Sequence, residues 1–288
     1  MHFFCNFLDF PSKNGVSGRF LSGRCLIFGY KFFHMKRVFF LAMLLFSLQA
    51  AAQKTQVVAH RGYWDTPNNA QNSITALKTA QQIPVYGSEF DVNMTADGVM
   101  VVSHGPKLES IPDVQKATYK EVKKVRLKNG EKVPTLKKYL KEGKKGNIKL
   151  IFELKVHPAG EIENLAVKKS VEMVKKMNLQ DKVEFISFSL EACRQIAQLM
   201  PGVMVQYLNG KIHPKELKEM GIMGIDYHHS NFTEHPEWVE VAHKLGMIVN
   251  VWTVNKEDLM QKMIDLKVDY ITTDAPETAL KLIESSSR

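Results

Sequence analysis

Short apolar stretches recur along the chain from residue 57 to its end, and most are followed by a stretch with the periodicity of an amphipathic helix. Apolar runs of strand length that alternate with helices are typical of a parallel sheet, in which each helix connects one strand to the next. The expected strands cover residues 57–60, 85–92, 99–103, 148–154, 183–188, 203–208, 222–227, 247–254 and 268–273. The expected helices cover residues 72–82, 162–177, 191–199, 214–220, 236–245, 256–266 and 276–283.

The number of strand–helix units favours a closed barrel. About eight units in roughly 236 residues agree with the usual size of a (β/α)8 barrel, about 250 residues. An open doubly wound sheet is the alternative, but it usually has fewer strands and a glycine-rich first turn, which this chain lacks. The sequence therefore predicts an α/β fold, a single (β/α)8 TIM barrel over residues 53–288.

One segment interrupts the alternation of strands and helices. Asp97-Gly98 is a strong turn signal that joins the second expected strand to residues 99–103 as a hairpin. The lysine-rich segment after it, at about residues 105–145, is expected to form a small capping insertion over the barrel mouth, after the second barrel strand. Its lysines are most simply a solvated surface, and attraction of anionic head groups or a membrane surface is the alternative.

The first 52 residues have a different pattern. Residues 35–37 are Met-Lys-Arg, residues 38–48 are apolar, and three alanines follow at 50–52. This order is that of a secretory signal peptide, and its apolar run is too short to span a bilayer. We expect a signal peptide at residues 35–52 and export to the periplasm or the outside. Residues 1–34 are then an extension upstream of the true start, with a structured N-terminal extension as the alternative.

Charge and cysteine content narrow the expected partners. The chain has 39 Lys and Arg residues and 30 Asp and Glu residues, and the first 52 residues contain six of the basic and one of the acidic residues. The rest of the chain therefore has 33 basic and 29 acidic residues, so it is only weakly basic. No basic stripe interleaved with aromatic residues is present, so nucleic acid is not an expected partner. Cys193 is alone after residue 52 and cannot form an internal disulfide. We expect a small-molecule substrate and at most peripheral membrane contact; the oligomeric state is not indicated.

Acidic residues gather at the ends of two expected strands, where TIM barrels place their chemistry. Glu89 and Asp91 lie two apart on one strand, so their side chains share a face, and Glu153 ends the next barrel strand. Three carboxylates in one mouth repel one another unless a cation lies between them, and hard oxygen ligands favour Ca²⁺ or Mg²⁺. For Glu153-x-Lys155 alone a salt bridge is the simpler explanation. With Glu89 and Asp91 nearby, one divalent cation is the better explanation.

Two histidines and an arginine complete the candidate chemistry. His60-Arg61-Gly62 ends the first strand: the planar fork of Arg61 matches phosphate oxygens, and Gly62 allows a close backbone turn. His104 follows the hairpin strand. A lone histidine at a strand end is more often a hydrogen-bonded structural residue, but phosphodiester cleavage needs a base or nucleophile on one side of phosphorus and an acid on the other. The set indicates metal-assisted attack on a phosphate ester.

Two aromatic residues lie at later strand ends. Trp252 is as well explained by packing as by contact with a substrate; the family resemblance described next implies glycerol or a choline-like cation for that contact. Phe188 is expected to line the pocket, with packing as an equal alternative.

Taken together, these residues resemble the glycerophosphodiester phosphodiesterase family. The match runs from residue 57 to residue 283 in the family's order, and the ordered set is specific although each motif alone is weak. The motifs are His60-Arg61-Gly62, Asn72-Ser73, Glu89-x-Asp91, Thr95-x-Asp97-Gly98, His104, Pro134-Thr135-Leu136, Glu153-x-Lys155, Ser187-Phe188, Trp252-Thr253-Val254-Asn255 and Thr273-Asp274-x-Pro276.

The resemblance implies a TIM-barrel hydrolase that converts a deacylated phospholipid to glycerol 3-phosphate and a free alcohol. It also implies three ligands for a divalent cation, two histidines for acid–base or nucleophilic catalysis, and two phosphate-binding cations. These are Glu89, Asp91 and Glu153; His60 and His104; and Arg61 and Lys155.

The chain departs from the family pattern at two positions. The family usually has Glu-Asn-Thr/Ser where this chain has Gln71-Asn72-Ser73, and His-Asp where this chain has His104-Gly105. Neither change removes an implied metal ligand or catalytic histidine. Both bear on metal affinity, on the basicity of His104 and on the choice of substrate.

Metal-dependent hydrolysis of glycerophosphodiesters is thus the expected function, and two alternatives stand beside it. One is a phospholipase D-like enzyme of the same barrel type that cleaves lyso-lipids and releases a cyclic phosphate; secreted toxins of that kind tend to carry disulfides, and Cys193 is alone. The other is a catalytically silent module that binds head groups, which would be expected to have lost a carboxylate or a histidine. The nucleophile, water or the neighbouring glycerol hydroxyl, is left open.

Overall fold

The computed structural model describes residues 54–286, so the expected signal peptide and upstream extension lie outside the described residues. Eight parallel strands close into a barrel because β1 pairs with both β9 and β2. A ninth strand, β3, is antiparallel to the end of β2. The strands are β1 (Gln56–Ala59), β2 (Gly87–Met94), β3 (Met100–Val102), β4 (Lys149–Leu154), β5 (Val183–Ser187), β6 (Val205–Tyr207), β7 (Gly224–His228), β8 (Ile248–Trp252) and β9 (Tyr270–Thr273). The predicted TIM barrel is confirmed.

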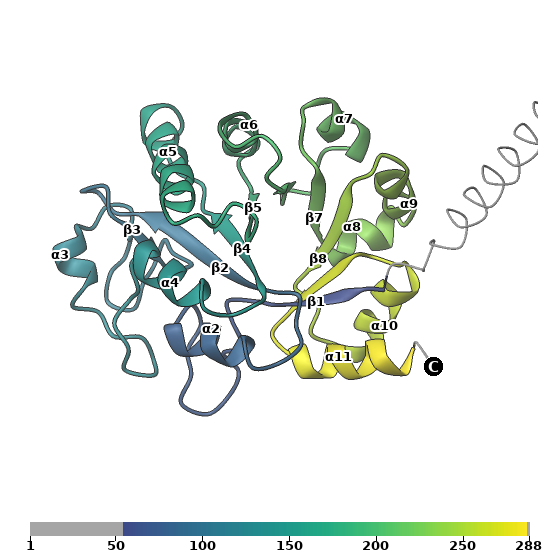
Figure 1. The fold of residues 1–288 in the computed structure, drawn as a ribbon, viewed down its shortest axis with the longest axis horizontal. Helices are drawn as coiled ribbons and strands as arrows, with labels where there is room; N and C mark the ends of the chain where they lie inside the picture. Colours follow the sequence, from purple (N-terminus) through teal and green to yellow (C-terminus); the bar gives the residue numbers. More distant parts are fainter. Residues whose placement is uncertain (1–53, 287–288) are drawn as a thin grey trace, which may run out of the picture. The chain divides into compact units, whose positions relative to one another are not determined.

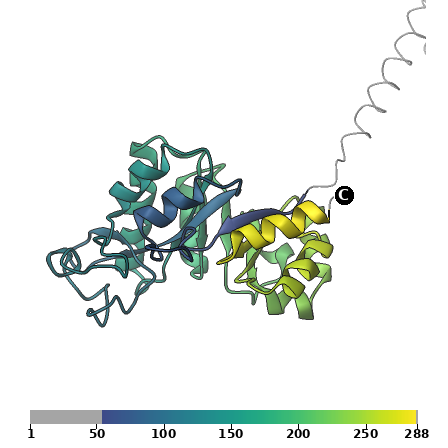
Figure 2. The ribbon, with the colours of Figure 1, turned by 90° about the horizontal axis from the view of Figure 1, so that it is seen from below.

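The helices lie outside the ring of strands (Figure 1). The last of them, α11, runs beside β1 on the outer side, and the second view shows the same arrangement (Figure 2). The helices are α2 (Ile74–Ala80), α3 (Tyr119–Val122), α4 (Leu136–Gly143), α5 (Glu161–Lys176), α6 (Leu190–Leu199), α7 (Pro214–Glu219), α8 (His229–Glu234), α9 (Glu237–Lys244), α10 (Glu257–Asp265) and α11 (Pro276–Ser285). Among residues 54–286, none of these helices is long and apolar enough to cross a membrane.

Two apolar layers hold the barrel together, because alternate residues of each strand face opposite sides. The larger layer lies between the strands and the helices and includes Phe90, Phe152 and Phe185, whose rings contact one another in series at tilted angles. The smaller layer fills the barrel interior with Val58, Ile151, Ile186, Leu208 and Tyr270. The residues that alternate with the outer layer therefore face inward, and those near the C-terminal strand ends form the site described below.

The expected insertion at about residues 105–145 has two parts with different packing. Its first part contains α3 and a satellite core that includes Leu108, Val114, Val122 and Val133. Its last part is α4, which contacts α2 and β3 and buries its apolar face in the main core. The helix α4 is therefore part of the outer helix layer, and three of the lysines in this segment, Lys137, Lys138 and Lys141, lie on its exposed side.

Candidate active site

Three carboxylates meet where β2 and β4 run side by side. Glu89 and Asp91 alternate with outward-facing Phe90, and the strand register places Asp91 opposite Glu153. All three are buried, and one carboxylate oxygen from each lies within 4.8 Å of the others. The period of a β-strand and the parallel register thus produce the cluster.

Burial and mutual repulsion shift the pKa values of the carboxylates in this cluster. Burial, followed by the charges of Asp91 and Glu153, raises the pKa of Glu89 well above its ordinary range. Burial, followed by the charge of Asp91, raises the pKa of Glu153 to about 7. Burial would raise the pKa of Asp91 as well, but the cations Lys155 and Arg61 hold it at about 2. Two of the three carboxylates therefore need further positive charge to ionise fully.

Lys155 supplies part of that charge. Its Nζ lies 2.6 Å from Glu153 Oε1 and 3.3 Å from Asp91 Oδ1. Although burial alone would lower the pKa of Lys155, the charges of Glu153 and Asp91 raise it, so the ammonium stays protonated. Glu89 Oε2 accepts a hydrogen bond from the backbone N–H of Arg61 at 2.7 Å, whereas the buried Glu89 Oε1 has no hydrogen-bond partner within residues 54–286.

These observations fit a divalent cation. An ionised buried oxygen without a donor, surrounded by other carboxylates, is costly unless a cation binds it. The donor set is entirely carboxylate oxygen, which suits the hard cations Ca²⁺ and Mg²⁺. Glu89, Asp91 and Glu153 are the residues that could hold such an ion.

The backbone after β1 places Arg61 beside the carboxylates. Arg61 itself has a φ of 55° and Gly62 a φ of 81°, and a Cβ on Gly62 would lie 2.7 Å from Ala76 Cβ. Only glycine permits this close approach of the β1–α2 loop to α2. The Arg61 guanidinium then lies with Nε 3.4 Å from Asp91 Oδ2 and with Nη1 donating to Gln71 Oε1 at 2.8 Å.

His60 is held in place by the carboxylate of Asp274, the residue that directly follows the last barrel strand, β9. Its Nδ1 lies 2.8 Å from Asp274 Oδ1. Asp274 also accepts hydrogen bonds from Trp64 Nε1 at 3.0 Å and from Asn255 Nδ2 at 2.7 Å. A donor at Nδ1 fixes the tautomer of the ring, so Nε2 is the nitrogen left for proton transfer.

His104 lies after β3 at the rim of the pocket, and part of its surface is exposed. Desolvation of the enclosed part of the ring lowers its pKa to about 4, and Lys155 and Arg61 add to this effect against the opposing charge of Asp91. In the pocket without an anion, His104 is therefore neutral at pH 7.

One pocket of about 120 Å³ joins these groups. Its aromatic side is formed by Phe188 and Trp252, whose ring centroids lie 5.5 Å apart in an edge-on arrangement. Trp252 is fixed by a hydrogen bond from its Nε1 to the carbonyl of Asp226 at 2.9 Å. The lining residues are His60, Arg61, Glu89, His104, Glu153, Lys155, Ile186, Phe188, Leu208, Asp226, Trp252, Thr253 and Thr272.

This geometry has counterparts in known proteins. A sequence model of the glycerophosphoryl diester phosphodiesterase family matches residues 60–278. The chain belongs to this family. It is 31% identical over 247 residues to a glycerophosphodiester phosphodiesterase of Caldanaerobacter subterraneus subsp. tengcongensis, with 80% of this chain and 98% of that protein covered.

Solved structures of the family have the same fold. A glycerophosphodiester phosphodiesterase from Parabacteroides distasonis matches with a TM-score of 0.80 at 49% identity, covering 82% of this chain and 99% of the other. An Oleispira antarctica phosphodiesterase in complex with the product sn-glycerol-3-phosphate matches with a TM-score of 0.70 at 25% identity, covering 80% and 97%. The chain is thus a TIM-barrel phosphodiesterase, as its motifs indicated.

The structure brings all of the predicted site residues together. Every one of them lines the pocket except Asp91, which lies beside it and contacts both Arg61 and Lys155. The chemical role of each of these side chains stays a prediction.

Three further polar residues belong to this arrangement and had no predicted role. Asp274 orients His60. Asn72 exchanges two hydrogen bonds with Asp91, one to Oδ2 at 2.8 Å and one from the Asp91 backbone N–H at 3.0 Å. Asp226 lies in the pocket, and burial, followed by the charge of Glu153, raises its pKa well above its ordinary range. The available signals were the place of Asp226 near the end of the expected strand at residues 222–227 and the motifs containing Asn72 and Asp274. The contacts with Asp91 and His60 join residues 19 and 214 positions apart, which a local pattern does not show.

The two departures from the family pattern have structural explanations. Gln71 accepts a hydrogen bond from Arg61 through a neutral amide, whereas a glutamate at this position would neutralise part of the Arg61 charge. The positive charge of Arg61 is therefore available to an anionic ligand. Gly105 has a φ of 53°, and a Cβ there would lie 2.8 Å from Asn93 Nδ2. Asn93 is itself fixed, donating to the carbonyl of Ser103 and accepting from Gln115, so it occupies the space that a side chain at position 105 would need.

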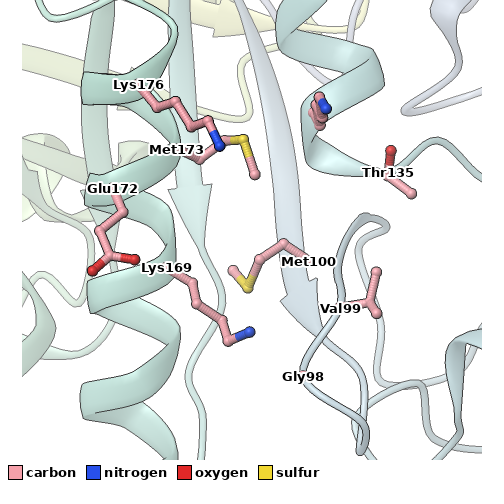
Figure 3. Close-up of a pocket in the computed structure, with 9 residues that line it drawn as sticks. Gly98, Val99, Met100, Thr135, Lys169, Glu172, Met173 and Lys176 are labelled. Carbon is pink, nitrogen blue, oxygen red and sulfur yellow. The ribbon is translucent and has the colours of Figure 1, made fainter.

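A larger groove of about 450 Å³ lies between α5 and β3. Figure 3 shows Lys169 and Lys176 directed toward this groove, which Glu172 of the same helix also lines. None of the predicted site residues lines it, and it contains no histidine. The chemistry therefore belongs to the smaller pocket at the strand ends.

Proposed function

We propose that this chain is a metal-dependent glycerophosphodiester phosphodiesterase that hydrolyses deacylated phospholipids to glycerol 3-phosphate and a free alcohol. The observation that carries the proposal is the convergence of three buried carboxylates, two imidazoles and two cations on one pocket. The product named for the Oleispira antarctica relative supports the choice of substrate.

The two cations of the chain bind the phosphate. The Arg61 guanidinium and the Lys155 ammonium lie on either side of Asp91 and present donors to the pocket. Their charges oppose the negative charge that builds up on the phosphoryl oxygens in the transition state. A divalent cation held by Glu89, Asp91 and Glu153 would polarise a phosphoryl oxygen and lower the pKa of a bound water.

His60 and His104 divide the proton transfers. Asp274 holds His60 with Nε2 free, which suits a base on the attacking side. His104 is neutral in the pocket without an anion. A bound phosphodiester places negative charge beside it, which raises its pKa and favours a protonated imidazole that can donate to the departing alkoxide.

Export and a place in lipid head-group turnover are part of the proposal. The signal-like pattern at residues 35–52 supports export. Deacylated phospholipids outside the cytoplasm would supply the substrate.

Release of glycerol 3-phosphate from glycerophosphocholine, with and without a chelator, tests the function. We expect release with Mg²⁺ or Ca²⁺, loss of release in chelator, and recovery when the cation is restored. Phosphorus NMR of the products, on glycerophosphocholine and on a lyso-lipid, separates this function from its alternatives. A cyclic phosphate from the lyso-lipid would indicate the phospholipase, and no turnover of either substrate would indicate a binding module.

A further inference from the structure

The floor of the pocket contains a buried carboxyl group that the proposed mechanism does not use. Asp226 is 1% exposed and lines the pocket, and its Oδ1 has no hydrogen-bond partner in the described part of the chain. It faces the barrel interior because its neighbours Ile225 and Tyr227 pack in the outer layer. It is not among the carboxylates that could share a metal ion.

The rest of the floor offers no comparable group. Ile186 and Leu208 are apolar, and the hydroxyl of Thr272 already donates to Asn250 Oδ1 at 3.1 Å. Asp226 is therefore the floor residue whose Oδ1 makes no hydrogen bond, and the side chain of Asn250, its neighbour in the register with β8, only partly offsets the rise that burial causes in the pKa of Asp226. A buried polar atom in this position normally has a partner, which a ligand or an ordered water supplies.

Asp226 lies one inward-facing layer below the rim of the pocket. It precedes His228 by two residues on β7, and the register pairs His228 with Trp252 and Asp226 with Asn250. Two residues along a strand correspond to about 6–7 Å. The groups suited to the phosphate, Arg61 and the histidines, follow the ends of strands β1 and β3. When the phosphate of a substrate lies among these groups, only the part of the substrate farthest from phosphorus can therefore contact Asp226.

We propose that Asp226 is a specificity-determining residue whose carboxyl group hydrogen-bonds the terminal hydroxyl of the glycerol moiety, the hydroxyl farthest from phosphorus. This inference rests on the proposed function and deepens it. A three-carbon diol suits the pocket of about 120 Å³, and the alcohol on the other side of phosphorus is left toward the solvent. The enzyme then selects for the glycerol moiety through this hydrogen bond, whereas it accepts different alcohols on the other side of phosphorus.

Binding of two phosphate monoesters to the full chain tests the proposal. Isothermal titration calorimetry in Mg²⁺ compares glycerol 3-phosphate with 2-hydroxypropyl phosphate, which lacks only the terminal hydroxyl. We expect the parent protein to bind glycerol 3-phosphate at least about tenfold more tightly, because the analogue leaves a buried polar group unpaired. In Asp226→Leu this ratio should fall to about 1, mainly through weaker binding of glycerol 3-phosphate.

Two variants act as controls. Asp226→Asn keeps hydrogen-bonding atoms in the same volume and should keep a preference for glycerol 3-phosphate. Thr272→Val removes a floor hydroxyl that is already bonded to Asn250, and should leave the ratio at the parent value. Thermal melting checks the fold of each variant, and Asp226→Ala replaces Asp226→Leu if the latter does not fold.

Equal binding of both phosphates by the parent, or an unchanged ratio in Asp226→Leu, would overturn the proposal. If the monoesters bind too weakly to measure, kcat/KM on glycerophosphocholine and on 2-hydroxypropyl phosphocholine gives the same ratio. Failure of the parent to release glycerol 3-phosphate from glycerophosphocholine would reject the proposed function itself. Release together with equal use of both substrates would reject only the role of Asp226.

Discussion

At the scale of single residues, the contact between His60 and Asp274 decides how the site can work. The two residues are 214 positions apart in the chain, yet their side chains lie 2.8 Å apart because β1 pairs with β9. Three side-chain donors converge on the carboxylate of Asp274, from His60, Trp64 and Asn255. These bonds, led in effect by the one from His60, overcome burial and lower the pKa of Asp274.

Replacement of this carboxylate should disturb His60 without removing it. In Asp274→Asn the amide NH₂ must face one of the three donors in either orientation. We expect kcat to fall roughly 10²- to 10⁴-fold, the range for a carboxylate that fixes a catalytic imidazole. Steady-state kinetics over a pH range measures the effect, and a changed pH profile separates it from a general loss of structure. An Asp274→Asn enzyme with parental kcat and pH profile would show that Asp274 does not position His60.

The assignment of His104 as acid and His60 as base predicts a dependence on the leaving group. Choline is a poor leaving group unless it is protonated, whereas nitrophenolate leaves without a proton. His104→Ala should therefore lose most of its activity on glycerophosphocholine and retain much more on a nitrophenyl phosphodiester. His60→Ala should lose its activity on both substrates. The measurement is the ratio of mutant to parent kcat/KM on each substrate.

The same comparison can reverse the assignment. If His60→Ala spares the nitrophenyl ester while His104→Ala loses equally on both substrates, the two roles are exchanged. Equal losses on both substrates for both mutants would contradict a role for either residue as the acid.

At the scale of elements, β2 and β4 together form the candidate metal site. Strand β2 contributes Glu89 and Asp91 to one face, and the parallel register with β4 adds Glu153 beside Asp91. Asn72, in the loop just before α2, then fixes Asp91 through two hydrogen bonds. No single element contains enough oxygen ligands for a hard cation, which usually takes six or more.

The three carboxylates should consequently act as a unit. Glu89→Gln, Asp91→Asn and Glu153→Gln should each weaken metal affinity at least about tenfold and lower activity, with partial rescue by excess Mg²⁺ or Ca²⁺. A double variant should not be rescued. Metal titration of activity, together with the metal-induced rise in melting temperature, provides the measurement.

Glu184→Gln is the matched control for this series. Glu184 is also buried, on neighbouring β5, but it bonds Tyr86 and Gln206 and is not in the carboxylate cluster. Its replacement should leave the metal dependence unchanged. Full activity of the parent enzyme in chelator would remove the metal from the mechanism.

At the scale of the whole molecule, the described domain has its own core and begins where the signal-like segment ends. The described residues, 54–286, form one compact unit. The family match at residues 60–278 lies entirely within it. Residues 1–52 lie outside the family match, and their role in targeting stays a prediction.

The exported protein should accordingly begin near Gln53. The basic residues at 36–37, the apolar run at 38–48 and the alanines at 50–52 form the expected cleavage pattern. N-terminal sequencing of the protein recovered from the periplasm or the medium checks this expectation. A folded, membrane-free product that retains residues 1–34 would contradict it.

The sequence by itself determined the barrel, the order of its strands and the identity of the chemical groups. Strand and helix periodicity are local, and a residue at a strand end can be recognised from the apolar run before it. For that reason His60, Glu89, Asp91 and Glu153 could be proposed without coordinates. The helix α4 was not predicted, because its sequence contains several lysines and only three large apolar residues, Leu136, Tyr139 and Leu140, so its amphipathic pattern is weak.

Only the tertiary structure decided which groups meet and what each environment does to them. Barrel closure and packing between distant segments bring His60 to Asp274 and Asn72 to Asp91. The same packing places Asn93 where a side chain at position 105 would lie. The same holds for Asp226: its place near the end of an expected strand is visible in the sequence, but the burial of its Oδ1 without a hydrogen bond depends on the closed barrel. Hydrogen bonding and desolvation depend on distances in space, and a sequence pattern carries distances only along the chain.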